Sequence, residues 1–214
     1  MLEARALECT RGERTLFSDV SFALAAGSLM HVAGTNGSGK TTLLRILTGL
    51  GLADAGEVLW RGAPVRTQRE TLAHELLYVG HAAALKDDLS AEENLQVACV
   101  LAGCAVTPAA AQGALDAFGL AECRHLPARL MSQGQRRRAV LARLVPLTMA
   151  QVAPLWILDE PFNALDTAAV SFLENLLVKH VDNGGVVILT THQDAPITAR
   201  ATTRLDLNVT GVHA

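Results

Sequence analysis

The chain contains a glycine-rich segment with the spacing G-x-x-x-x-G-K-[ST], formed by Gly34-Thr35-Asn36-Gly37-Ser38-Gly39-Lys40-Thr41 and followed by Thr42. Glycines let the backbone curl so that consecutive N–H groups face one anion, and the start of a following helix adds the positive end of its dipole. In such a loop Lys40 would contact the β- and γ-phosphates of a nucleotide, and the Thr41 hydroxyl would bind Mg²⁺. Chance produces this spacing in fewer than roughly one per cent of chains of this length, so the loop predicts a nucleoside triphosphate site.

Two adjacent carboxylates, Asp159 and Glu160, directly follow the apolar run 155–158. At the end of a strand, Asp159 can hold Mg²⁺ through water, and Glu160 can polarise a water molecule that attacks a phosphate. Two acids at a strand end can also be no more than solvated surface groups. The phosphate loop in the same chain favours the catalytic interpretation.

A short polar segment, 132–135, precedes the stretch 136–145, which has helical character. Ser132 and Gln135 have the spacing of a capping box, which would start a helix there. This structural interpretation is compatible with a functional one, because a capped helix start that carries Gly134 can also bind an anion. The three arginines 136–138 are interpreted as a solvated helix face, as charge runs usually are.

Buried parallel strands are expected to position these groups. The apolar runs 155–158 and 186–189 are each followed at once by polar residues, which is typical of strands covered on both faces, with functional groups at their carboxyl ends. The segment between them carries one helical stripe and ends at two glycines. The phosphate loop likewise lies between a predicted strand and a predicted helix. Short β-strands are expected over 4–25, with a turn at 11–13, and helices over about 85–130.

Composition narrows the class of protein. The chain has 214 residues, half of them hydrophobic, and a formal charge of −3, which predicts one globular domain, 1–214, and argues against an electrostatic nucleic-acid binder. The apolar stretch 97–106 is too short to span a bilayer, and the charged start lacks the apolar core of a signal peptide. We therefore expect a cytosolic protein that can still dock on a membrane protein. The four cysteines have no metal-site spacing and are expected to be buried thiols.

Taken in order, these motifs resemble those of the ATP-binding cassette (ABC) ATPases, and the set covers nearly the whole chain. The family signature LSGGQ has its counterpart in MSQGQ, followed by LWILDEP, ALD and TTH. The resemblance implies an α/β P-loop fold with a mostly parallel sheet, an N-terminal antiparallel β portion and an inserted helical subdomain over roughly 85–145. It implies ATP and Mg²⁺ as cofactors.

The resemblance also implies a head-to-tail dimer, in which Ser132, Gly134 and Gln135 of one copy contact the γ-phosphate held by the other. By the same resemblance Asp166 is the acid of the D-loop, and His192 is a switch histidine that contacts the γ-phosphate and takes part in catalysis with Glu160 and Lys40. Two alternatives stay open. Asp166 can simply cap the following helix, and His192 can be a polar residue at a strand end.

Several stretches are similar to the ATP-binding subunits of haem exporters that serve cytochrome c maturation, among them GEVLWRG, LLYVGH, LWILDEPFNALD and GGVVILTTHQ. This similarity implies a peripheral protein on the cytoplasmic face of the bacterial inner membrane, bound to integral membrane transporter subunits. It implies that MgATP hydrolysis drives those subunits and that the complex, rather than this chain, handles haem. Alternatives are an ABC ATPase for another cargo, or a soluble one that acts on nucleic acid or ribosomes.

The chain departs from the family pattern at two places. His81 stands where the family usually has a glutamine that contacts Mg²⁺ and faces the membrane subunit, so His81 is a candidate metal-site residue or, alternatively, a docking residue. The aromatic side chain that usually stacks on adenine is missing, and Arg11 occupies about that place. Phe17 is the nearest aromatic residue, but its apolar neighbours favour a role in the core.

Overall fold

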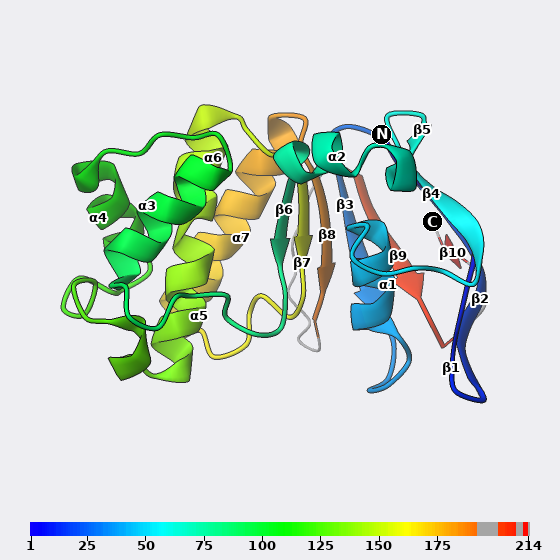
Figure 1. Ribbon diagram of the computed structural model, residues 1–214, viewed down its shortest axis with the longest axis horizontal. Coiled ribbons are helices and arrows are strands. Elements are labelled where there is room, and N and C mark those ends of the chain that lie inside the picture. Colours follow the sequence, from blue (N-terminus) through cyan, green and yellow to red (C-terminus); the bar gives the residue numbers. More distant parts are fainter. Residues whose placement is uncertain (192–200, 209–211, 214) are drawn as a thin grey trace.

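The computed structural model describes residues 1–191, 201–208 and 212–213, and Figure 1 shows its elements arranged in three parts. An antiparallel sheet lies at one end of the molecule, a mostly parallel sheet in the middle and a group of helices at the other end. The fold therefore has the α/β organisation that the sequence predicts.

The antiparallel sheet has four strands in the order β2-β1-β4-β5. Its strands are β1 (Leu2–Arg11), β2 (Arg14–Leu24), β4 (Ala55–Trp60) and β5 (Ala63–Pro64). Leu2 pairs with Leu24 on one side and with Trp60 on the other, so β1 is central in the sheet. The predicted β-strands of the N-terminal segment and the turn that connects them are confirmed.

The second sheet has six strands in the order β10-β9-β3-β8-β7-β6. Its strands are β3 (Ser28–Ala33), β6 (Leu76–Val79), β7 (Leu155–Leu158), β8 (Val186–Thr190), β9 (Ala201–Asp206) and β10 (Val212–His213). All neighbouring strands run parallel except β10, which pairs antiparallel with β9. Every residue of β7 and β8 is buried, as expected for strands that are covered on both faces.

The helices lie between the strands along the chain, and several of them begin at a side-chain cap. They are α1 (Lys40–Leu47), η1 (Val65–Thr67), α2 (Arg69–Glu75), α3 (Ala91–Leu101), α4 (Pro108–Ala117), η2 (Ala128–Leu130), α5 (Gln133–Ala142), α6 (Leu144–Ala150) and α7 (Thr167–Asp182). Ser90, Thr107 and Ser132 each accept a hydrogen bond from the first turn of the helix that they precede, which explains where α3, α4 and α5 begin.

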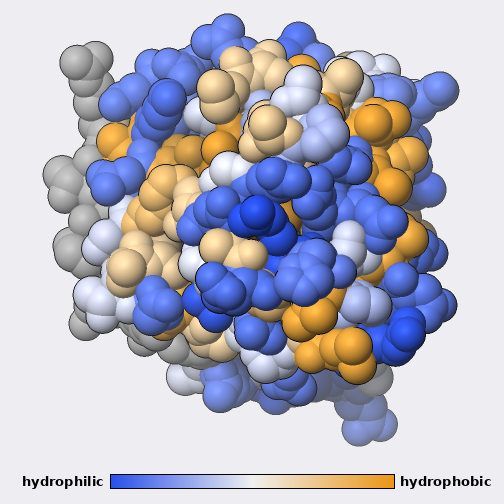
Figure 2. Space-filling view, turned by 90° about the vertical axis from the view of Figure 1, so that its left-hand side faces the viewer, coloured by the Kyte–Doolittle hydropathy of each residue, from blue (hydrophilic) through white to orange (hydrophobic). Residues whose placement is uncertain are grey.

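The elements α3, α4, η2, α5 and α6 form the helical end of the molecule, here called the helical segment (residues 91–150). Figure 2 shows this end, where hydrophobic patches alternate with hydrophilic surface. Within the described residues, no helix combines the length and the apolar character needed to cross a membrane.

The parallel sheet separates two hydrophobic cores. Successive residues of β7 face opposite sides, since Leu155 and Ile157 pack in the core under the antiparallel sheet and α1, while Trp156 and Leu158 pack in the core shared with α7 and the helical segment. All four cysteines are free and buried, as predicted: Cys9 lies in the first core and the other three lie in the second. The sheet is thus held on both faces, and its carboxyl edge is fixed in place.

A buried histidine lies in the second core. His180 of α7 stacks on Trp156 of β7, with ring centroids 3.8 Å apart and an angle of 8° between the rings. The His180 Nε2 atom lies 3.3 Å from the carbonyl oxygen of Pro154. Burial lowers the pKa of His180 to about 4, so this ring is neutral in the folded protein near neutral pH.

Candidate functional site

The glycine-rich loop lies between β3 and α1, at the carboxyl edge of the parallel sheet. Gly39 immediately precedes α1 with a φ of +100°, which a residue with a side chain rarely adopts. At Gly34, a Cβ atom would lie 2.4 Å from the Ser38 hydroxyl oxygen, so the loop closes tightly on itself. The sequence-predicted strand, loop and helix are therefore all present.

Lys40 is buried and folds back over this loop. Its Nζ atom donates hydrogen bonds to the carbonyl oxygens of Gly34 (2.8 Å) and Thr35 (3.2 Å). The loop is held from outside by Asn208, whose Oδ1 atom accepts from the Thr35 backbone N–H (3.1 Å) and hydroxyl (2.9 Å). The Ser38 hydroxyl is buried and has no hydrogen-bond partner among the described residues. A loop with a central cation and a free hydroxyl donor fits a bound phosphate.

Asp159 lies at the end of β7 and is only 2% exposed. Its two carboxylate oxygens accept hydrogen bonds from the Thr41 hydroxyl (2.8 Å) and from the Thr190 hydroxyl (2.7 Å). Asp159 follows β7, Thr190 ends β8, and Thr41 lies in the first turn of α1, which follows β3. Because β3, β8 and β7 pair in parallel, their carboxyl ends meet at one edge of the sheet and bring these three side chains together. A carboxylate beside a hydroxyl, next to a phosphate loop, is a donor set that suits Mg²⁺, which usually takes few protein oxygens plus substrate phosphates and water.

Glu160 is the next residue, and its backbone is held in an unusual conformation. Its φ is +51°, and its N–H donates a 2.8 Å hydrogen bond to the Thr190 hydroxyl. The side chain is only 8% exposed. Thr190 thus contacts both acids, and it orients the Asp159 carboxylate and the Glu160 backbone together.

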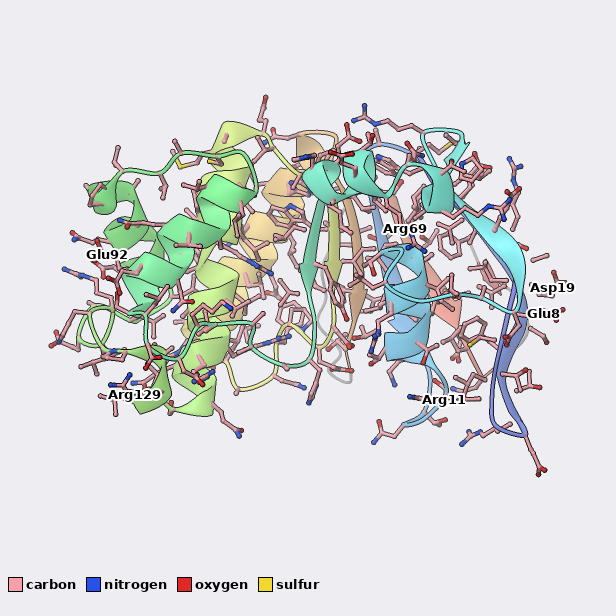
Figure 3. All side chains as sticks on the ribbon, in the orientation of Figure 1. Glu8, Arg11, Asp19, Arg69, Glu92 and Arg129 are labelled. Atoms are coloured by element: carbon pink, nitrogen blue, oxygen red, sulfur yellow. The ribbon has the colours of Figure 1, made fainter. Side chains whose placement is uncertain are left out.

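A cavity of about 630 Å³ joins these parts. Of the residues predicted from the sequence, its lining includes Asn36, Gly37, Gly39, Lys40, Thr41, Thr42, His81, Asp159 and Glu160. Arg11, Arg14, Leu16 and Asn163 also line it. Arg11 comes from the end of β1, and its side chain lies below α1, beside the loop (Figure 3). The lining of the cavity therefore combines three basic side chains, Arg11, Arg14 and Lys40, with two carboxylates. Phe17 is 5% exposed and packs in the core, as predicted.

The segment predicted to complete the site of a second copy starts α5. Ser132 and Gln135 form the predicted capping box: the Ser132 N–H donates to the Gln135 side chain (2.8 Å), and the Gln135 N–H donates to the Ser132 hydroxyl (3.2 Å). Ser132 is exposed, and Gly134 and Gln135 are partly exposed. Ser132, Gly134 and Gln135 do not line the 630 Å³ cavity of their own chain.

The structure corrects one prediction about this helix. Arg137 is buried rather than solvated, because it lies on the inward stripe of α5 with Val140 and Leu141. Its guanidinium group donates hydrogen bonds to the carbonyl oxygens of Gly80 (2.6 Å), Asp159 and Glu160 (2.9 Å). Its neighbours Arg136 and Arg138 are partly exposed and pair with Asp87 (2.7 Å) and Asp166 (3.4 Å).

Of the remaining predicted site residues, Asp166 caps a helix, His81 lines the cavity, and His192 is not described by the structure. Asp166 caps α7 by accepting a 2.8 Å hydrogen bond from the Ala169 N–H, which is the structural alternative considered for it. His81 is exposed and lines both the 630 Å³ cavity and an adjoining one of about 430 Å³. His192 lies outside the described residues.

Three residues that support the site, Thr190, Arg137 and Asn208, were not among the residues predicted for it, and neither were Arg14, Leu16 and Asn163, which line the cavity. Thr190 follows an apolar run, so its position at a strand end is a usable signal. Arg137 could have been recognised by its spacing from buried apolar positions on the helix. Asn208 contacts a residue 173 positions earlier in the chain, and nothing in the local sequence indicates that contact.

Comparison with known proteins agrees with this geometry. The family described as ABC transporter matches residues 17–163. The chain is 50% identical over 194 residues to the cytochrome c biogenesis ATP-binding export protein CcmA of Nitrosomonas europaea, covering 91% of this chain and 89% of that protein. It is 51% identical to the protein of the same name from Aromatoleum aromaticum, covering 97% and 95%. A dimeric ATP-binding cassette solved in a post-hydrolysis state with ADP and Pi has the same fold, with a TM-score of 0.79, 22% identity and coverage of 96% and 94%.

Proposed function

Since this chain belongs to the ABC transporter family, we propose that it is the ATP-hydrolysing subunit of a membrane exporter that serves cytochrome c biogenesis. The relatives that share about half of its residues are named for that export process, and they are covered almost end to end. Haem is the proposed cargo, because it is the cofactor that c-type cytochromes need, and the membrane partner rather than this chain handles it.

One observation carries the proposed chemistry. Lys40 and Thr41 of the glycine-rich loop lie in the same cavity as Asp159 and Glu160, although the two pairs are far apart in the sequence. The loop suits the phosphates of ATP, with Gly34, Thr35, Asn36, Gly37, Ser38, Gly39 and Thr42 as the proposed backbone and side-chain contacts. The acids suit the metal and the water that hydrolysis requires.

The proposed reaction is an in-line attack of water on the γ-phosphate. The oxygen of the water bonds to the γ-phosphorus while Glu160 accepts a proton from the water. The bond between the γ-phosphorus and the β–γ bridging oxygen breaks, and ADP leaves. Lys40 stabilises the negative charge that develops on the phosphate oxygens. Thr41, Asp159 and His81, which line the same cavity, would hold Mg²⁺, and the ion would neutralise phosphate charge when bound. His192 is proposed to contact the γ-phosphate.

A second copy of the chain is proposed to complete each site. Ser132, Gly134 and Gln135 lie at an exposed helix start outside the cavity of their own chain, where they are accessible to the nucleotide of another cassette. We propose a head-to-tail dimer that binds integral membrane subunits at the cytoplasmic face of the bacterial inner membrane.

The test is ATP turnover by the purified chain and by the variant Glu160→Gln. An amide cannot accept the proton of water, so the variant is expected to lower kcat about a hundred-fold or more while ATP stays bound. The exposed Glu122→Gln is the matched control and is expected to behave as wild type. Near-normal turnover in Glu160→Gln would remove Glu160 from the reaction. Co-purification from detergent-solubilised membranes, with measurement of haem, tests the exporter and its cargo.

A further inference from the structure

Arg137 is a buried cation whose hydrogen bonds go to backbone carbonyl groups of two different loops. It is only 7% exposed, and its Nη1 atom donates to the Gly80 carbonyl after β6. Its Nη2 atom donates to the carbonyls of Asp159 and Glu160 after β7. A buried guanidinium is costly unless its N–H groups are matched, and its planar fork fixes the direction of each acceptor. Arg137 is therefore placed to set the relative positions of these loops.

The Glu160 backbone needs such support. A φ of +51° is unfavourable for a residue with a side chain, and it persists only where the surroundings hold it. The Glu160 N–H is held by the Thr190 hydroxyl at 2.8 Å, and its carbonyl is held by Arg137 at 2.9 Å. The Thr190 side chain of β8 and the Arg137 side chain of α5 thus hydrogen-bond to the backbone N–H and the carbonyl of Glu160, respectively.

We propose that Arg137 is a positioning residue for the Glu160 carboxylate. It holds the strained backbone of Glu160 so that the carboxylate stays directed into the cavity. Arg137 also lies on the helix that Ser132 caps, and Gly80 directly precedes His81. The same guanidinium group therefore links the helix proposed to reach the second copy with the acid proposed to activate water. This inference rests on the proposed ATPase function.

The hydrogen bonds of the Arg137 guanidinium group predict that different substitutions of Arg137 will lower ATP turnover to different extents. Methionine has a similar length and no donors, so Arg137→Met frees all three carbonyls. Lysine keeps the charge and can donate to a carbonyl from its single nitrogen, so Arg137→Lys retains part of the hydrogen bonding to these carbonyls. The control is Arg136→Met, since Arg136 lies on the same helix but donates to Asp87 and the Ala128 carbonyl instead of to the Asp159 and Glu160 carbonyls.

The experiment measures kcat, KM for ATP and melting temperature for these three variants. Arg137→Met is expected to lower kcat about ten- to a hundred-fold with KM within about two-fold, because a small displacement of a catalytic group has effects of that size. Arg137→Lys should recover part of the loss, and Arg136→Met should match wild type. In the Glu160→Gln background, Arg137→Met should change the residual kcat by less than about two-fold, because the group that it positions is already inactive.

Two results would overturn the inference while leaving the ATPase proposal intact. One is a kcat for Arg137→Met close to wild type in a protein whose turnover depends on Glu160. The other is a further ten-fold loss of kcat in the Glu160→Gln background, which would show that Arg137 acts independently of Glu160. If Arg137→Met does not fold, Arg137→Lys carries the same test: a lower kcat at unchanged melting temperature supports positioning, and an unchanged kcat contradicts it. A wild-type protein without turnover would instead contradict the proposed function.

Discussion

The Thr41 hydroxyl donates a 2.8 Å hydrogen bond to a carboxylate oxygen of Asp159, although the two residues are 118 positions apart in the sequence. This contact joins the start of α1 to the end of β7 in the lining of the 630 Å³ cavity. The two oxygens lie where one cation could contact both. The pairing of these residues is therefore the structural basis for the proposed Mg²⁺ site.

Asp159→Asn is expected to raise the Mg²⁺ concentration needed for half-maximal turnover about ten-fold or more, because a neutral amide attracts the cation less than a carboxylate does. Titration of ATPase activity with MgCl₂ measures this shift. The exposed Asp182→Asn is the control for the same chemical change. An unchanged Mg²⁺ requirement in Asp159→Asn would exclude Asp159 as the metal residue.

Lys40→Ala is expected to weaken ATP binding about ten- to a hundred-fold, the effect of losing one charge-assisted hydrogen bond to a phosphate. The variant also loses the two bonds from Nζ to the loop carbonyls, so the loop should become less ordered. Isothermal titration calorimetry measures the affinity. Wild-type affinity in this variant would contradict the assignment of the loop.

Ser132→Arg is expected to abolish turnover by placing a bulky cation where a second copy should approach. Ser132→Ala separates the effect of bulk from the loss of the hydroxyl, because it removes the helix cap, at a cost of about 1 kcal/mol, and the proposed nucleotide contact without adding bulk. Wild-type activity should depend on protein concentration, since each site needs two chains. If the monomer hydrolyses ATP at full rate at every concentration, the dimer proposal fails.

His81→Gln is expected to keep turnover near the wild-type level, because a glutamine carbonyl can replace a neutral imidazole as an acceptor or metal ligand. His81→Ala removes that group and should lower turnover if His81 serves the site whose cavity it lines. Both variants are assayed with the membrane subunits present. Full activity but weakened binding of those subunits in His81→Ala would assign the residue to docking instead.

The free energy of unfolding is expected to fall as the pH drops from about 6.5 to about 4. The pKa of His180 is about 4 in the folded protein, against 6.5 for an unperturbed histidine, so in this window the unfolded chain binds the proton and the folded chain does not. The stability is fully present above pH 6.5, and the loss reaches about 3 kcal/mol at pH 4. Urea unfolding at several pH values should show a flatter profile for His180→Phe, which keeps the stacking on Trp156, than for the exposed control His125→Phe. Parallel profiles for the two variants would contradict this origin of the pH dependence.

The sequence predicts those parts of the fold that local patterns determine. The loop at 34–41, the buried apolar runs at 155–158 and 186–189 and the capping box at Ser132 each follow from patterns within a few residues. The run of like charges at 136–138 predicts solvent exposure, but the helical phase turns Arg137 inward, so this prediction is wrong for Arg137. The Asn208 contact with Thr35 depends on the parallel pairing of β9 with β3, which is a property of the whole fold.

The distribution of the cysteines has a practical consequence. A thiol reacts with alkylating reagents as the thiolate, and burial raises the pKa of Cys9, Cys99 and Cys123, that of Cys99 to about 11. In the folded protein all four thiols are covered, with Cys9 on one side of the parallel sheet and Cys99, Cys104 and Cys123 on the other. Mass spectrometry after alkylation therefore distinguishes which side has opened, since one added group marks the antiparallel side and three mark the helical side. A cysteine introduced on the surface would likewise take a label without removal of the native four.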